Sequence, residues 1–281
     1  MRTRLFAALP AVVIVVGTGC AQEAPAGMDN ISRFVFERVE PVEGLDAVAQ
    51  ETEIRDAVAR LREEFDSQPI TADADFTGLL EDLDEENVEG LEGVGERIEL
   101  LQLAQGFAFA NITPCTQQHM VNLLTANRSM ELHPDVYETY DKVFDGDEAA
   151  YRNGDVDFLK WTTSYKILQP PVGSAWSADV RAMSRRVRAA DGEGDILLTK
   201  VFLPQPAVFD GEGSSFDLDF QVEIWFDDGN GGQAHFYGMW RRMVLGPVDS
   251  SNGLFIDQTL SGFVDFEDRV GVACGDGRLD E

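Results

Sequence analysis

The sequence predicts an α+β fold, in which an N-terminal helical region precedes a curved antiparallel β-sheet or a meander barrel. Two observations lead to this prediction. Apolar residues follow the helical period of about 3.6 residues in the first half of the chain, and the strand period of 2 from residue 157 onwards. In the second half, Gly- and Asp-rich segments also separate the apolar runs at short intervals, as turns do in antiparallel sheets.

The predicted helices occupy the first half of the chain. A short helix can begin at Asp29 or Asn30, and it ends before Pro41. In the second helix, over residues 45–65, apolar side chains recur at i, i+4, i+7 and i+11 from Ile54 and form one stripe. Three more helices are predicted over residues 95–109, 113–126 and 134–144.

The clearest strand covers residues 216–226, where apolar side chains alternate strictly with acidic and amide side chains. This alternation predicts one buried face and one polar face. After a turn over residues 227–231, a second strand over residues 234–245 returns antiparallel to the first. Further strands are predicted over residues 158–168, 196–202 and 255–266, whereas 180–189 fits either a short helix or a strand.

The chain is strongly acidic. Of its 281 residues, 51 are Asp or Glu and 22 are Lys or Arg, which gives a formal net charge of -29. Nucleic acids and anionic membrane surfaces would both repel this charge, so the composition excludes nucleic-acid binding. The excess is densest in residues 21–100, which hold 23 acidic and 6 basic residues.

The N-terminus has the pattern of an export signal. Arg2 and Arg4 precede an apolar run over residues 5–16, and small residues follow that run up to Cys20. The run is too short to span a bilayer as a helix, which takes about 20 residues. The sequence therefore predicts a cleaved signal peptide over residues 1–19.

The ending Thr18-Gly19-Cys20 resembles a bacterial lipobox, although Gly17 stands where that motif prefers Leu. The resemblance implies that Cys20 becomes the lipidated first residue of the mature chain. Ala21 after the cysteine resembles the outer-membrane sorting choice of such lipoproteins. The alternative is an ordinary secretory signal in which the cysteine is incidental.

These observations divide the chain into four parts. A signal peptide over residues 1–19 and a lipidated tether over 20–28 precede an acidic helical region over 29–153 and an antiparallel β region over 154–281. The last two parts are expected to fold as one unit. The expected location is the cell envelope, as an outer-membrane lipoprotein that faces the periplasm or the exterior.

Cys115 and Cys274 are the cysteines that remain beside Cys20. In an oxidising compartment two such thiols are expected to pair as a disulfide. The alternative is a metal site in which His119, one helical turn after Cys115, and His133 act as further ligands. The spacing lacks a paired Cys-x-x-Cys motif, so the disulfide is preferred.

An acidic segment over residues 73–84 partly matches a calcium-binding EF-hand loop. Asp73 and Asp75 stand at the first two ligand positions, and Asp84 stands where the loop expects glutamate. Pro69 interrupts the helix that should lead into such a loop. These three aspartates are therefore weak calcium candidates, and a solvated acidic turn is preferred.

The predicted hairpin brings a carboxylate close to a histidine. A register in which paired residue numbers sum to 458 places Glu223 opposite His235 on the polar face, with Asp217 opposite Arg241. Glu223 and His235 are the candidates for acid–base catalysis, and the alternative is a solvated ion pair. No nucleotide-binding, cofactor-binding or hydrolase motif is present, so no cofactor is expected.

The aromatic residues of the β region suggest either an apolar pocket or a packed core. They are Trp161, Trp176, Phe202, Phe220, Trp225, Phe236 and Trp240. The sequence predicts a non-enzymatic envelope protein, held at the membrane by its N-terminal lipid, that binds an apolar small molecule or a protein partner. The alternative is a periplasm-facing hydrolase that uses Glu223 and His235.

Overall fold

A computed structural model describes residues 22–42, 44–67, 76–168, 174–188, 194–228 and 232–280. The strands are β1 (Phe76–Leu80), β2 (Gln105–Thr113), β3 (Tyr137–Asp145), β4 (Phe158–Ile167), β5 (Trp176–Val187), β6 (Ile196–Phe202), β7 (Val208–Phe209), β8 (Ser214–Asp227), β9 (Gln233–Leu245) and β10 (Val248–Asp249). The α-helices are α1 (Met28–Arg38), α2 (Ala47–Ser67), α3 (Glu85–Val88), α4 (Gln117–Thr125), α5 (Ser129–Leu132), α6 (Glu148–Asn153) and α7 (Gly253–Gly275), and Gly95–Leu103 forms the 3-10 helix η1.

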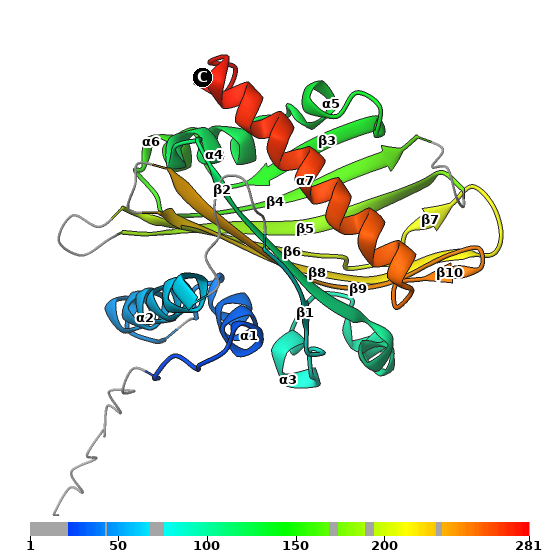
Figure 1. Ribbon diagram of the computed structural model, residues 1–281, viewed down its shortest axis with the longest axis horizontal. Helices are drawn as coiled ribbons and strands as arrows, with labels where there is room; N and C mark the ends of the chain where they lie inside the picture. The colour runs from blue at the N-terminus through cyan, green and yellow to red at the C-terminus, as the bar shows by residue number, and fades with distance from the viewer. Residues whose placement is uncertain are drawn as a thin grey trace, which may run out of the picture.

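All the strands belong to one antiparallel sheet with the order β1-β2-β9-β8-β6-β5-β4-β3, with β10 beside β9 and β7 beside β5. The run from β3 to β9 is a meander, to which β2 and β1 are added beyond β9. Within the described residues β1 and β3 are the two edges, so the sheet is curved but open (Figure 1). The predicted α+β class with a curved antiparallel sheet is confirmed.

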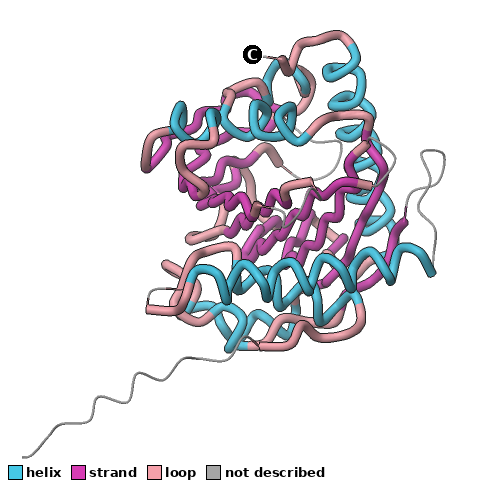
Figure 2. The backbone as a smooth tube through the Cα atoms, turned by 90° about the vertical axis from the view of Figure 1, so that its left-hand side faces the viewer, coloured by secondary structure: helices cyan, strands magenta, loops and turns pink. Residues whose placement is uncertain are grey.

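Helices cover both faces of the sheet. Figure 1 shows α7 crossing one face, with α4, α5 and α6 on the same side, and Figure 2 shows the sheet between this layer and the layer of α1 and α2. The apolar face of β8 and β9 packs on α1, where Phe36 contacts the rings of Phe220 and Trp240 at centroid distances of 6.1 and 6.0 Å. Among the described residues no helix is long and apolar enough to cross a membrane.

The chain reaches α1 along the surface of α2. The Gln22 backbone N–H donates to Glu53, Arg60 forms an ion pair with Glu23, and Ala24 is buried. These residues belong to the segment expected as a tether, and they pack on the fold. Gly27, with a positive φ of 86°, precedes the first residue of α1, so the helix begins before the predicted caps.

Three predicted elements are wrong. The helix predicted over 95–109 is η1 followed by β2, because β2 lies between β1 and β9 and is buried along most of its length. The helix predicted over 134–144 is the strand β3. A bulge between Tyr137 and Thr139 gives its aromatic residues a helix-like spacing. The strand predicted over 255–266 lies within the 23-residue helix α7, which Asn252 caps.

The helix predicted over 113–126 begins later than expected. Thr113 ends β2, and Thr116 caps α4 through a capping box with His119. The segment 180–189, which fitted either a helix or a strand, lies mainly in β5. Residues 29–153 therefore contain three strands besides their helices.

Candidate ligand-binding cavity

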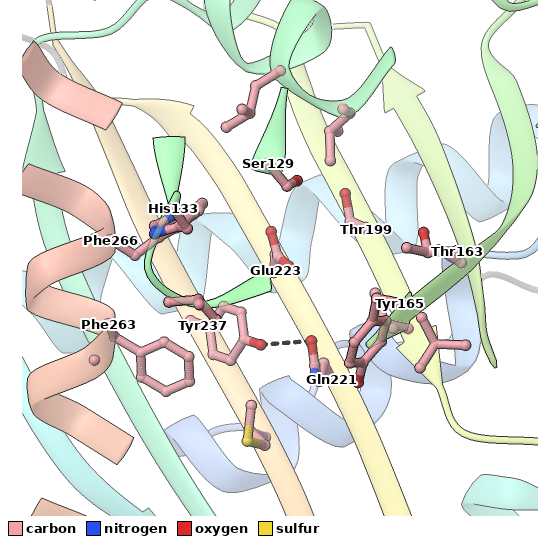
Figure 3. Close-up of a pocket in the computed structure, with 18 of the residues that line it drawn as sticks. Ser129, His133, Thr163, Tyr165, Thr199, Gln221, Glu223, Tyr237, Phe263 and Phe266 are labelled. Carbon is pink, nitrogen blue, oxygen red and sulfur yellow. Dashed lines mark hydrogen bonds between the residues drawn. The ribbon is translucent and has the colours of Figure 1, made fainter. Parts of the chain in front are cut away.

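A cavity of about 540 Å³ lies between the sheet and α7. Strands β2, β3, β4, β5, β6, β8 and β9 form its floor, and α7 covers it with residues between Gln258 and Glu267, among them Phe263 and Phe266. The end of α4 and the segment around α5 close it on one side. Figure 3 shows side chains from these elements pointing into this space.

The polar face of β8 and β9 forms part of the cavity wall. Gln221 and Glu223 from β8 and His235, Tyr237 and Arg241 from β9 all line the cavity. The expectation that this face is solvated is wrong, because α7 covers it. Residues 255–266 of α7 were predicted as a strand of the sheet, so the prediction contained no element to cover the polar face.

The predicted hairpin register is wrong by two residues. Glu223 pairs with Tyr237 and Trp225 with His235, so paired numbers sum to 460. A shift of two residues keeps every side chain on the same face of the sheet. Glu223 and His235 are therefore diagonal neighbours instead of directly opposite residues, with Oε2 and Nε2 3.8 Å apart.

The slip also changes the partner of Arg241. In the observed register Arg241 lies opposite Asp219. Arg241 therefore donates to both carboxylate oxygens of Asp219, at 2.9 and 3.2 Å, instead of pairing with Asp217. Asp219 is fully buried, so this ion pair is a structural part of the cavity floor.

His235 lies between two carboxylates. Its Nδ1 is 2.8 Å from Oε1 of Glu267, and its ring stacks on Trp225 with centroids 4.4 Å apart. Oε2 of Glu267 accepts from Asn111 at 3.3 Å. Glu267 thereby holds the imidazole in place, and Nε2 of His235 is buried without a hydrogen-bond partner among the described residues.

Burial raises the pKa of Glu223 to about 7. The nearby carboxylate of Glu267 raises it further, whereas His235 and Lys142 oppose the shift. Among the described residues no hydrogen bond reaches the Glu223 carboxylate. Glu223 can therefore gain or lose a proton near neutral pH inside the cavity.

Lys142 enters the cavity from β3. Its Nζ donates to the carbonyls of Leu124 and Ala126 at the end of α4, at 2.9 and 3.2 Å. It also lies 5.8 Å from the ring centroids of both Tyr140 and Trp161. Burial lowers the pKa of Lys142 to about 8, against the effect of Glu223.

Tyrosines make up much of the remaining wall. Tyr137 contacts Tyr140 and Tyr165 edge to face, at centroid distances of 4.9 and 5.9 Å. The hydroxyl of Tyr237 donates to Oε1 of Gln221 at 2.5 Å, the bond drawn in Figure 3. Burial raises the pKa of each of these tyrosines, so their hydroxyls stay neutral at physiological pH.

Cys115 and Cys274 are joined as a disulfide, with their Cα atoms 5.5 Å apart, as the sequence predicts. His119 lies within 4.8 Å of both sulfurs, but the disulfide leaves no thiolate to bind a metal. Instead, Nε2 of His119 is 3.0 Å from the carboxylate of Asp280. His133 stacks on Phe266 in the cavity wall at a centroid distance of 5.0 Å.

The calcium candidates are not brought together by the described residues. Asp73 and Asp75 lie outside them. Asp84 caps α3, where its carboxylate accepts from the backbone N–H of Asn87. The intervening residues Phe76–Leu80 form the edge strand β1.

No protein-family model and no curated protein matches the chain by sequence. Several solved structures are similar to this chain over much of its length. A STAR-related lipid transfer protein fragment from Xanthomonas axonopodis is 15% identical, with a TM-score of 0.38 over 73% of this chain and 99% of that one. Two human proteins are 10% identical: the StarD13 (DLC2) lipid transfer and protein localization domain, with a TM-score of 0.39 over 77% and 95%, and StAR-related lipid transfer protein 5, with 0.36 over 82% and 99%. These values are too low to transfer a ligand or an activity.

Proposed function

We propose that this protein binds an apolar small molecule in the cavity between the sheet and α7. The cavity itself carries the proposal, because its volume of about 540 Å³ is that of a small-molecule site. Aromatic and aliphatic side chains dominate its wall, and a few polar groups are set among them. A protein partner would need an exposed surface, whereas these side chains face inward.

The cavity is too large to be a packing defect. Protein interiors are close-packed, and an empty volume costs free energy in proportion to its size. Buried polar atoms in the wall, Nε2 of His235 and Nε2 of His133, also lack partners among the described residues. A bound molecule would fill the volume and can satisfy such groups.

The export signal and the lipid anchor on Cys20 form the second part of this proposal. Residues 5–20 support it through their sequence pattern. Gln22 is hydrogen-bonded to Glu53, so a lipid on Cys20 would leave one residue between the anchor and the folded domain. The layer of α1 and α2 would then lie nearest the membrane surface, with the cavity on the opposite face of the sheet, in an outer-membrane lipoprotein of the envelope.

Gly262 offers a direct test of the cavity. It lies on the cavity-facing side of α7, and a Cβ added there would meet no atom within 4 Å. Gly262 is exposed at the rim of the cavity, so Gly262→Phe would add a ring there with room for its Cβ. Replacing a glycine inside a helix also stabilises the helix, by up to about 1 kcal/mol. We expect at least tenfold weaker binding of an uncharged fluorescent dye, N-phenyl-1-naphthylamine, with an unchanged or higher melting temperature.

Ser261→Phe is the matched control. Ser261 is the preceding residue of the same helix, it is exposed, and it does not line the cavity. This variant should bind the dye as the wild type does. If Gly262→Phe binds the dye with unchanged affinity, the ligand does not occupy the cavity and the proposal is wrong.

A second candidate function is hydrolysis of a bound ligand by Glu223 and His235. The observation that favours it is the orientation of His235 by Glu267, with a carboxyl group that titrates near neutral pH beside it. In this case His235→Gln would abolish hydrolysis of aryl esters by the purified protein. Equal rates for the wild type and this variant would eliminate the hydrolase.

A further inference from the structure

One end of the cavity presents acceptors for hydrogen bonds and few donors. The carboxylate of Glu223 reaches the cavity without a donor from the described residues. Nε2 of His235 has no hydrogen-bond partner among the described residues and lies 3.8 Å from Oε2 of Glu223. When the ring is neutral and Nδ1 donates to the Glu267 carboxylate, Nε2 carries a lone pair, so two neighbouring acceptors face each other with no donor between them.

Most donors near this end are already engaged. Lys142 uses two of its three N–H groups on the carbonyls of Leu124 and Ala126. Tyr140 is hydrogen-bonded to Ser129 and Thr163, and Tyr237 donates to Gln221. The indole N–H of Trp225, whose ring stacks on His235, has no partner among the described residues, so it does not donate to Glu223 or His235. A bound ligand can therefore supply the donors that Glu223 and His235 lack.

The surroundings also favour a positive charge on the ligand. Glu267 is buried and Glu223 is partly buried, and both carboxylates approach the same imidazole. The aromatic wall already holds one cation, Lys142, whose ammonium lies 5.8 Å from the rings of Tyr140 and Trp161. The net charge of the whole chain, -29, attracts cations to the molecule and repels anions.

We propose that the ligand of this cavity is an apolar amine, whose protonated nitrogen pairs with Glu223 while its apolar body lies among the aromatic side chains of the wall. The inference rests on the proposed function, because it names the class of ligand for the same cavity. A carboxylate ligand would meet Glu223 and Glu267. A quaternary ammonium would bring charge without an N–H group for the two acceptors.

Four probes with the same decyl chain test this assignment: decylamine, decanol, decanoate and decyltrimethylammonium. Each competes with N-phenyl-1-naphthylamine for the purified full chain at pH 8, below its critical micelle concentration. We expect decylamine to bind at least tenfold more tightly than each of the other three, as one charged hydrogen bond and ion pair in a buried site provides.

Glu223→Gln keeps the shape of the side chain and removes its charge. We expect this variant to lose about tenfold or more of its affinity for decylamine while its affinity for decanol changes less than about twofold. Glu89→Gln removes the same charge from an exposed position in the chain, and it should leave both affinities unchanged. This control separates the local carboxylate from the net charge of the molecule.

The outcomes distinguish the ligand class from the function. If the dye binds but decanol or decanoate competes as well as decylamine, the amine assignment is wrong and the binding function stands. Equal affinity for decyltrimethylammonium would also overturn it, since N–H donors would then have no role. If neither the dye nor any probe binds the wild type, both proposals are wrong. Should Glu223→Gln fail to fold, the ranking of the four probes on the wild type decides alone.

Discussion

Glu223 is a carboxyl group held in a cavity, where ionisation costs more free energy than in water. Burial raises its pKa to about 7, and Glu267 on α7 adds to this effect. His235 on β9 and Lys142 on β3 oppose it. Between the unfolded value of 4.5 and about 7, the folded protein holds a proton that the unfolded chain has lost. Stability therefore falls as the pH rises through this window.

Glu223→Gln should remove this dependence. We expect the variant to be more stable than the wild type at pH 8 by about 1–3 kcal/mol, and nearly equal to it at pH 5, where Glu223 is protonated in the folded protein. Urea unfolding at the two pH values measures the difference. Glu89→Gln, at an exposed site, should show the wild-type dependence. A constant difference between Glu223→Gln and the wild type at both pH values would contradict the assignment of the titration to Glu223.

At the scale of elements, α7 completes the cavity, and its two ends are held differently. Near the C-terminal end, the disulfide joins Cys274 to Cys115, and Arg269 donates to the carbonyl of Leu132 at 3.1 Å. Just beyond the helix, Asn122 donates to the carbonyl of Leu279 at 2.8 Å. Near the N-terminal end, Phe255 is buried in a separate apolar cluster. The C-terminal half is therefore tied covalently to the start of α4.

Removing the disulfide should weaken this attachment. The two cysteines are 159 residues apart, and a cross-link of this span stabilises a fold by about 2–5 kcal/mol. We expect a Cys115→Ala, Cys274→Ala double variant to lose stability in this range in urea, and amide exchange to increase first in the last turns of α7. The wild type under reducing conditions should lose stability in the same range and show the same increase in amide exchange. Unchanged stability of both would show that packing alone holds α7.

The errors of the sequence prediction have local causes. Phe255, Thr259, Phe263, Phe266 and Val270 follow each other at spacings of four, four, three and four residues, which is the helical period. The aromatic and β-branched composition of 255–266 concealed this pattern. In β3 the reverse happened, since a bulge gave the strand a helical spacing. A longer sequence window reveals the helical period of α7, whereas the bulge in β3 has no comparable signal in the sequence.

The sequence predicted only part of the candidate site. Glu223 and His235 share a face in any register with an even slip, so their proximity followed from alternation alone. Glu267 could not be linked to them, because it comes from a helix that crosses the sheet 32 residues after His235. The cavity likewise depends on how far α7 stands from the sheet, and local patterns do not contain that distance.

At the scale of the whole molecule, the negative net charge would repel the protein from an anionic membrane, whereas a lipid at the N-terminus would hold it there. Cleavage after residue 19 would remove Arg2 and Arg4 and change the net charge from -29 to -31. An anionic bilayer would repel this mature chain, so electrostatics cannot hold it at the membrane. Under the proposed lipidation, attachment would depend on the lipid of Cys20, which would contribute about 0.8 kcal/mol for each CH₂ group that it buries.

This dependence gives the prediction for the molecule as a whole. Expressed from its full sequence in a bacterium and labelled with radioactive palmitate, the wild type should carry the label and sediment with the membrane fraction. Cys20→Ala should lose the label and leave that fraction, because an anionic membrane repels a protein of this net charge. Cys115→Ala controls for the loss of a cysteine and should keep the label. A Cys20→Ala protein that still sediments with membranes would mean that another part of the chain binds them, and the lipid anchor would then be the wrong explanation.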